Sequence, residues 1–297
     1  YNSTPLEQPY YTWMNTGIKA AGNLEFIYPG TRYIGHGGEY ADWKINRENG
    51  KDISFFFLFN FGGYKSYHVF GKYTDFFGAY WHRDNFGMAR YSAHDEKAGK
   101  KIWIWGLSQQ GMIWEKLLTD ADGQYVEVQS GRLFNQAANE STFTPFKHLG
   151  FAPSTTDTWT EYWFPVMDTK GFVKANSVGA LNIRSGDGYL KIDFAPLLDL
   201  EEELKVMERD VVIYSKKVNL KTLKVFSDSV KFSGNGENLV VTLGTNLLQY
   251  RSAPRDAVLN RPVESPQDFD WNSVYGLYLQ GKQNIRQRYY LPAEEKL

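Results

Sequence analysis

The run "QYVEVQ" at residues 124–129 places a carboxylate in an alternating pattern typical of a β-strand. Side chains of a strand point alternately to its two faces, so Glu127 and Gln129 share one face and the two valines share the other. If the first face is open to water, Glu127 is an ordinary solvated carboxylate. If that face lines a hollow of aromatic rings, desolvation raises the pKa of Glu127 and makes it a candidate general acid or base.

Two further runs alternate aromatic with other side chains. In "WTEYW" the alternation puts Trp159, Glu161 and Trp163 on one face, with the carboxylate between two indoles. In "KIWIWG" it puts Trp103 and Trp105 opposite two isoleucines. A ring with a polar edge can stack on a sugar while its neighbours hydrogen-bond the sugar hydroxyls. The alternative is that these rings fill a core, which is the common fate of aromatic side chains.

Histidines supply further candidates for proton transfer. His68 in "KSYHVFG" and His82 in "GAYWHRD" lie in strand-like runs, where an imidazole can donate a proton to a ring oxygen or a leaving oxygen. His36 lies in the Gly-rich loop "YIGHGGEY", and loops carry functional sites disproportionately often. A structural role is the commoner outcome for each histidine. Gln129 and Arg132, which follow Glu127, are suited to binding hydroxyl groups.

Composition excludes several functional classes. The 297 residues carry a net charge of −1, so the surface offers no general attraction to a nucleic acid or an anionic membrane. No apolar run approaches the roughly 20 residues that span a bilayer. The chain has no cysteine, which excludes disulfides, thiolate nucleophiles and cysteine zinc sites. The usual metal-peptidase, serine-hydrolase and nucleotide-binding spacings are absent, so we predict no metal and no cofactor. The compartment stays open.

The elements that must position these residues are mostly strands. Short runs such as "LEFIY", "KIWIWG" and "MIWEKLL" recur between Gly, Pro, Asn and Asp turns, which is typical of an antiparallel sandwich. We expect this unit over residues 1–171 and a smaller β-rich unit, with fewer aromatics, over 172–252. A Pro-rich connector and a helical spacing of apolar residues follow over 253–297. The chain starts without methionine and its second helix is cut short, so we expect it to be a piece of a longer protein.

Several long strings resemble a known family. The strings "NSTPLEQPYYTWMN", "YPGTRYIGHGGE", "SYHVFGKYTDFFGAYWH", "GKKIWIWGLSQQGMIWEKLLTD" and "GQYVEVQSGRLFNQ" are similar to an uncharacterised bacterial domain family found ahead of tetratricopeptide repeats. The resemblance covers roughly residues 2–166 and implies an antiparallel supersandwich of the galactose-mutarotase type. It also implies that the N-terminal strands of the domain are missing, and that the tail begins a tetratricopeptide repeat.

The resemblance implies carbohydrate chemistry on the concave face of a large sheet. In mutarotases a glutamate on a late strand is the general base, and "YVEVQ" is similar to that strand, so Glu127 is the carried-over candidate. The segment similar to the mutarotase Asn-His motif is "PYYTWMNTG", which offers Trp13 and Asn15 but no histidine. His68, His82 or a second carboxylate such as Glu161 can take that place. Two carboxylates about 5–5.5 Å apart would indicate a retaining glycoside hydrolase, and about 6.5–9.5 Å an inverting one.

We therefore expect a carbohydrate-active enzyme, with glycoside hydrolysis of an oligosaccharide as the first hypothesis. The alternatives are a noncatalytic carbohydrate-binding module, an aldose epimerase, and a scaffold whose helical repeats recruit a protein partner. The predicted catalytic residues are Glu127, Glu161, His68 and His82. The predicted saccharide-binding residues are Trp13, Asn15, His36, Tyr67, Trp105, Gln129, Arg132 and Trp163.

Overall fold

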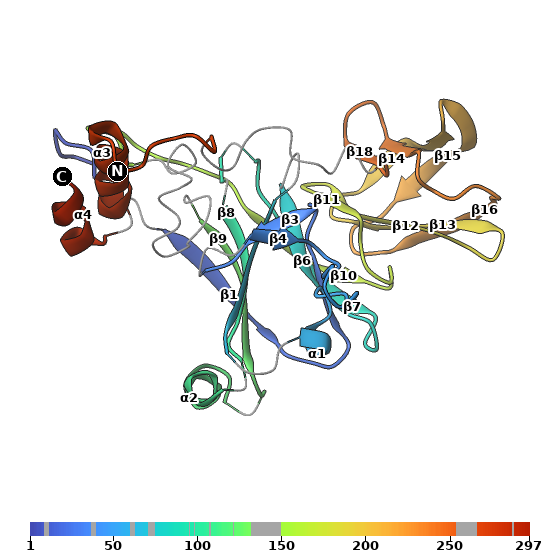
Figure 1. The fold of residues 1–297 in the computed structure, drawn as a ribbon. Coiled ribbons are helices and arrows are strands. Elements are labelled where there is room, and N and C mark those ends of the chain that lie inside the picture. Colours follow the sequence, from blue (N-terminus) through green and yellow to red (C-terminus); the bar gives the residue numbers. More distant parts are fainter. Residues whose placement is uncertain are drawn as a thin grey trace.

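A computed structural model gives the fold, which is mainly β with four antiparallel sheets and a helical C-terminal end, as predicted (Figure 1). It describes residues 1–8, 12–36, 40–59, 63–70, 75–94, 96–97, 99–106, 108–120, 122–131, 150–253, 266–286 and 288–297.

The largest sheet has six strands in the order β1-β9-β8-β5-β3-β4. The pairings of β9 with the edge strand β1 and with β8 are antiparallel and put Glu127 opposite Trp103 and Gln129 opposite both Asn15 and Lys101. The strands are β1 (Trp13–Lys19), β3 (Arg32–Ile34), β4 (Tyr40–Asp42), β5 (Lys65–Phe70), β8 (Gly99–Ile104) and β9 (Tyr125–Gly131).

A four-stranded sheet in the order β10-β7-β6-β2 covers one face of the six-stranded sheet. The core between the two sheets contains the valines of β9 and the isoleucines of β8, together with Leu24, Phe26 and Phe77 from the smaller sheet. The strands of this second sheet are β2 (Leu24–Ile27), β6 (Phe76–Trp81), β7 (Phe86–Tyr91) and β10 (Tyr162–Met167). Because strand side chains alternate, the inward position of Val126 and Val128 turns Glu127 and Gln129 to the other face of the six-stranded sheet.

The chain then forms a second pair of sheets, drawn in yellow and orange in Figure 1. One is ordered β11-β12-β13-β16 and the other β15-β14-β17-β18, and a separate apolar core lies between them. The strands of the first are β11 (Lys174–Asn176), β12 (Gly179–Gly186), β13 (Tyr189–Pro196) and β16 (Phe226–Lys231). Those of the second are β14 (Leu200–Glu208), β15 (Val211–Leu220), β17 (Leu239–Leu243) and β18 (Leu248–Arg251).

A third apolar cluster joins the two pairs of sheets. It combines Phe76, Tyr80 and Phe164 from the β10-β7-β6-β2 sheet with Phe172 and the alanines of β11, β12 and β13. The hydroxyl of Tyr80 also accepts hydrogen bonds from the backbone N–H groups of Thr169 and Lys170, at 3.2 and 2.9 Å. The connection between the sheet pairs is therefore packed and hydrogen-bonded.

Helices are few and lie outside the sheets. The run "MIWEKLL", expected to be a strand, is part of helix α2 (Gln109–Leu118), so that prediction was wrong. A short apolar run does not distinguish strand from helix by periodicity alone, and Met, Glu, Lys and Leu are good helix formers. Trp114 of α2 stacks on Trp105 with ring centroids 5.0 Å apart, which anchors the helix to the end of β8. The other helices are α1 (Phe56–Phe59), α3 (Val274–Arg286) and α4 (Tyr290–Lys296).

Helices α3 and α4 pack against each other, and Lys282 of α3 lies 3.8 Å from the carboxylate of Glu7 near the start of the chain. Of the helices in the described part of the chain, none combines the length and the apolar character that crossing a bilayer requires.

Candidate functional site

The face of the six-stranded sheet that points away from the core, here called the outer face, brings several predicted residues together. Glu127 and Gln129 project from β9, and their direct cross-strand neighbours on β8 are Trp103 and Lys101. On the other side of β9, Asn15 of β1 is paired with Gln129. Directly paired residues of an antiparallel sheet project to the same face, so all five side chains are neighbours.

Aromatic rings surround these polar groups. The rings of Trp103 and Trp105 have centroids 5.1 Å apart, and Tyr64 stacks on Trp103 at 4.9 Å. The imidazole of His36 meets Trp103 edge to face at 5.1 Å. On the β1 side, Trp13 is half-buried, while the neighbouring Asn15 is exposed. The outer face thus carries a band of rings that opens to solvent along β1.

Lys101 is a charged residue of this face that sequence reasoning missed. Its side chain is buried, with Nζ 4.5 Å from the ring centroid of Trp13 and 5.2 Å from that of Trp103. Burial lowers the pKa of Lys101 from 10.5 to about 7, while the negative charge of Glu127 acts in the opposite direction. The signal was present in "KKIWIWG", where Lys101 alternates with Trp103 and Trp105.

Glu127 is buried, at 7% exposure, and burial raises its pKa above 4.5. The charge of Lys101 and hydrogen bonds from Gln129 and Trp105 oppose this shift. The amide Nε2 of Gln129 donates to Oε2 of Glu127. The outer face therefore holds a carboxylate whose pKa is raised and an amine whose pKa is lowered, which makes the two groups candidates for accepting and donating a proton.

The three predicted histidines lie in different environments. His68 lies on β5, is buried, and places Nδ1 2.9 Å from the carbonyl oxygen of Ile34, with its ring 5.8 Å from that of Trp13. His36 is partly buried, and desolvation followed by the charge of Lys101 lowers its pKa to about 4, so it is neutral at pH 7. His82 lies in the turn directly after β6 of the other sheet, where its Nε2 is 2.7 Å from a carboxylate oxygen of Glu25.

Tyr67, a predicted binding residue, does not lie on the outer face. Tyr67 points into the core, where it meets Trp43 and Tyr33 at 5.4 and 5.0 Å, so its predicted contact with a sugar is wrong. The reason is alternation along β5, which turns Ser66 and His68 outward and Tyr67 inward. Arg132 lies outside the described residues.

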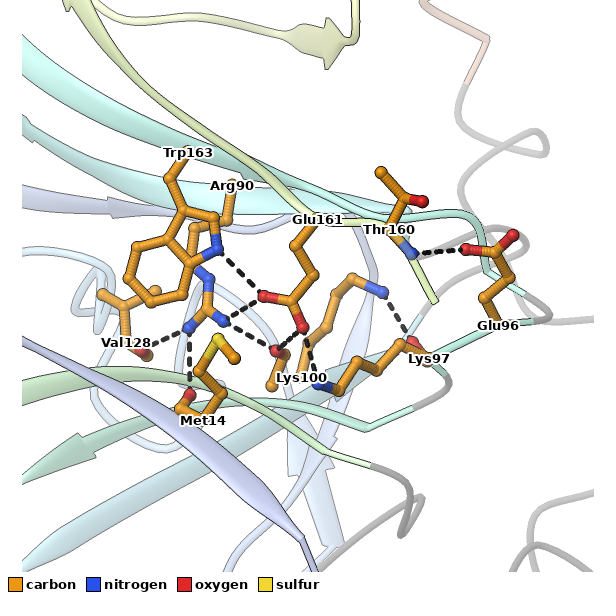
Figure 2. A network of polar contacts seen from close by, with 10 residues as sticks. Met14, Arg90, Glu96, Lys97, Lys100, Val128, Thr160, Glu161 and Trp163 are labelled. Carbon is orange, nitrogen blue, oxygen red and sulfur yellow. Dashed lines mark hydrogen bonds and ion pairs between the residues drawn. The ribbon is translucent and has the colours of Figure 1, made fainter. Parts of the chain in front are cut away.

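Glu161 belongs to a separate network on the core side of the sheet (Figure 2). One carboxylate oxygen, Oε1, lies 2.6 Å from Nζ of Lys97 and accepts a 2.8 Å hydrogen bond from Ser130. The other, Oε2, accepts hydrogen bonds from Arg90 at 2.6 Å and from the indole of Trp163 at 2.9 Å. Every oxygen of this carboxylate is therefore engaged by cationic or polar donors.

Arg90 fixes the position of this network. Its guanidinium lies 3.6 Å from the ring centroid of Trp163, and Nη1 donates to the carbonyl oxygens of Val128 and Met14 at 2.7 and 3.2 Å. Burial by itself raises the pKa of Glu161, but the donors Lys97, Arg90 and Ser130, with the charge of Arg90, outweigh it and hold the pKa at about 2. A carboxylate this firmly ionised cannot donate a proton near neutral pH.

The predicted pairing of Glu127 with Glu161 is therefore wrong. Ser130, the partner of Glu161, is three residues from Glu127 on β9 and points to the opposite face. Trp163 stacks on Arg90 in the same network and does not reach the outer face. The signal for this network was Arg90 in "FGMARY". This charged residue lies two positions after core-facing Met88 and therefore shares its face of the strand. Within the described part of the chain, no three His, Cys, Asp or Glu side chains gather as a metal site would require.

Comparison with known proteins places the chain among uncharacterised domains. A family model described as "Domain of unknown function (DUF5107)" matches residues 1–166. A solved TPR-domain containing protein from Parabacteroides distasonis is 22% identical, with a TM-score of 0.44 over 63% of this chain and 30% of that chain. The matched part is thus under a third of that protein's length. Because the family model covers more than half of the chain, the chain belongs to the DUF5107 family.

Proposed function

We propose that this chain is a carbohydrate-active protein that binds an aldose unit on the outer face and moves protons on it, as an aldose epimerase does. The observation that carries the proposal is the placement of Glu127 and Lys101 as diagonal neighbours under the rings of Trp13 and Trp103. A supersandwich of the mutarotase type is the fold that we propose for residues 1–171. The two facing sheets and the ring-lined outer face support it.

Ring opening of an aldose needs one base and one acid. The base removes the proton of the anomeric hydroxyl, the bond between the anomeric carbon and the ring oxygen breaks, and the acid protonates that ring oxygen. Glu127 in its ionised form can take the first proton, and Lys101 in its protonated form can supply the second. Reclosure on the other face of the carbonyl reverses both transfers, so that no proton or electron is gained or lost.

Sugar binding at this face follows from the residues around the pair. The indoles of Trp13 and Trp105 are half-buried, and rings with a polar edge stack on the apolar face of a sugar. Asn15 and Gln129 present amide groups, which both donate and accept hydrogen bonds and so suit hydroxyl groups. Hydrolysis by two carboxylates has no support from the geometry, because Glu161 lies on the other side of the sheet.

A noncatalytic carbohydrate-binding module is the second candidate. The specific observation in its favour is that the carboxylate of Glu127 already accepts hydrogen bonds from Gln129 and Trp105. A carboxylate satisfied in this way can serve to hold the strand and its rings in place. A protein partner at helices α3 and α4 stays a prediction.

The test is anomeric exchange, followed by NMR, of a panel of aldoses with wild type, Glu127→Gln and Lys101→Met. Proton transfer predicts that Glu127→Gln still binds sugar but loses about 100-fold or more in exchange rate. The matched control is Glu201→Gln, which changes an exposed carboxylate on β14. An unchanged rate of anomeric exchange in both outer-face variants, Glu127→Gln and Lys101→Met, rejects the proposed chemistry. Binding by wild type without exchange selects the noncatalytic module, and no binding of any aldose removes the saccharide site.

A further inference from the structure

An open cleft of about 870 Å³ lies between the two pairs of sheets, away from the outer face. One wall is the edge strand β2 with the segment that follows it. The other wall comes from β12, the end of β18 and the turn at residues 170–174. Small-molecule sites typically have volumes of about 300–1,000 Å³ and often lie where two structural units meet.

The charged side chains that line this cleft are mostly cationic. Among the described residues, Glu25 is the one carboxylate in the lining, against five cations: Lys44, Lys170, Lys174, Arg184 and Arg251. Glu25 is itself engaged by His82 at 2.7 Å and by Lys44 at 3.7 Å. A concave wall with an excess of one charge attracts ligands of the opposite charge.

Two of the five cations have no carboxylate partner among the described residues. Lys174 pairs with Asp75 at 2.8 Å, and Arg184 pairs with Asp193 at 2.6 Å. Lys170 and Arg251 are exposed and form no ion pair within the described residues. Lys170 lies in the connection between the two units and Arg251 lies at the end of β18, so a ligand that bridges them would contact the connection and the second unit.

The position of Lys170 is fixed by its backbone. Its N–H donates to Tyr80, and the carbonyl oxygen of the preceding Thr169 accepts a 2.7 Å hydrogen bond from the buried Asn182. Lys170 also has a φ of +61°, followed by Gly171 at +111°, which gives a tight turn. The peptide group between Thr169 and Lys170 is thus held on both of its sides, so the backbone here loses little freedom when a ligand binds.

The cleft also contains apolar surface from rings. Trp43 and Tyr28 are buried beside it, and the indole of Trp43 donates a 3.1 Å hydrogen bond to the carbonyl oxygen of Tyr28. Tyr250 on β18 is partly buried at the facing wall. A ligand with one apolar face and one or more negative groups would match rings and cations together.

We propose that this cleft binds a small organic anion that carries at least one ring, with its negative groups held by Lys170 and Arg251. Carboxylate and sulfate or phosphate groups share this chemistry, so the ligand can be a carboxylated or a sulfated or phosphorylated ring compound. The proposal is independent of the outer face, because none of the residues assigned there lines the cleft.

Calorimetric titration of the full chain tests the cleft with three probes of similar size. They are trigalacturonate for carboxylates, a disulfated disaccharide for sulfates, and maltotriose as the neutral comparison. We expect at least one anionic probe to bind about tenfold or more tighter than maltotriose, and its binding to weaken as salt is raised. Lys170→Ala and Arg251→Ala should each reduce the affinity about tenfold, the usual effect of losing a charged contact. The control is Lys217→Ala, an exposed lysine on β15 that does not line the cleft.

Preference for the carboxylated or for the sulfated probe identifies the anionic group. Equal affinity for maltotriose and both anions, or failure of both anions to bind, overturns the proposal. Equal loss in the Lys217→Ala control also overturns it, because the effect would then reflect overall charge. The Glu127→Gln variant should bind the anion as wild type does. This result separates failure of the cleft from failure of the outer face.

Discussion

Ser130 donates a 2.8 Å hydrogen bond to Glu161, and the side chain of Ser130 points to the side of β9 opposite to Glu127. The two glutamates that could form a catalytic pair are thus divided by one sheet. On the core side, Arg90 and Lys97 keep Glu161 ionised. On the outer side, burial raises the pKa of Glu127, although the charge of Lys101 opposes this shift. The same residue type has a structural role on one face and a candidate chemical role on the other.

Removing the carboxylate of Glu161 should destabilise the protein. Glu161→Ala leaves Arg90 and Lys97 buried without their ion-pair partner, and loss of one partner of a buried pair costs about 3–5 kcal/mol of unfolding free energy. Urea unfolding followed by tryptophan fluorescence measures the change. Glu201→Ala, at an exposed carboxylate with no ion pair among the described residues, should unfold as wild type does. Equal stability of both variants would show that the network contributes nothing.

Acid should remove the contribution of Glu161 over a defined range. Because its folded-state pKa is about 2, below the ordinary 4.5, its stabilising effect is complete above about pH 4.5 and falls as the pH drops toward 2. The difference in unfolding free energy between wild type and Glu161→Gln should therefore be largest at neutral pH and shrink between pH 4.5 and 2. The other carboxylates titrate equally in both proteins, so their contributions to this difference in unfolding free energy cancel. A difference that stays constant down to pH 2.5 would contradict the lowered pKa.

Lys101 should make stability rise with pH on the alkaline side. Its pKa is about 7 in the folded chain and 10.5 when exposed, so between these values the unfolded chain holds a proton that the folded chain lacks. Lys101→Met removes this effect: its stability advantage over wild type should be greatest at or below pH 7 and decline toward pH 10. Thermal unfolding across this range measures it, with exposed Lys217→Met as control. If the stabilities of wild type and Lys101→Met change in parallel with pH, the lowered pKa of Lys101 is rejected.

Gly78 on β6 should tolerate no side chain. A Cβ atom there would lie 2.0 Å from the carbonyl oxygen of Met88 and 3.0 Å from the ring of Phe172. Gly78→Ala must therefore separate β6 from β7 or displace the ring at the junction of the sheet pairs, at a cost of about 1–3 kcal/mol or more. Gly186→Ala is the matched control, since its Cβ would meet nothing within 4 Å. Chemical unfolding of both variants distinguishes this close approach from a general intolerance of alanine for glycine.

Part of the outer face could be predicted from local sequence. Alternation alone placed Glu127 beside Gln129 and opposite to the valines, and it placed Trp103 opposite to the isoleucines. The same rule, applied to "KKIWIWG", includes Lys101. Alternation could not predict helix α2, because a run of seven residues fits the period of a strand as well as that of a helix. The stacking of Trp114 on Trp105 was not predictable either, since it is a contact between separate elements.

The sequence by itself determined that the chain is mainly β with a helical end, and which side chains share a face within each strand, because alternation is a property of the local backbone. Only the tertiary structure decided which face became core, since that depends on the sheet that packs against it. The packing turned Tyr67 inward, enclosed Glu161 between Arg90 and Lys97, and brought Trp13 of β1 over Lys101 of β8. These contacts join residues far apart in the chain, and pairing between strands is what fixes them.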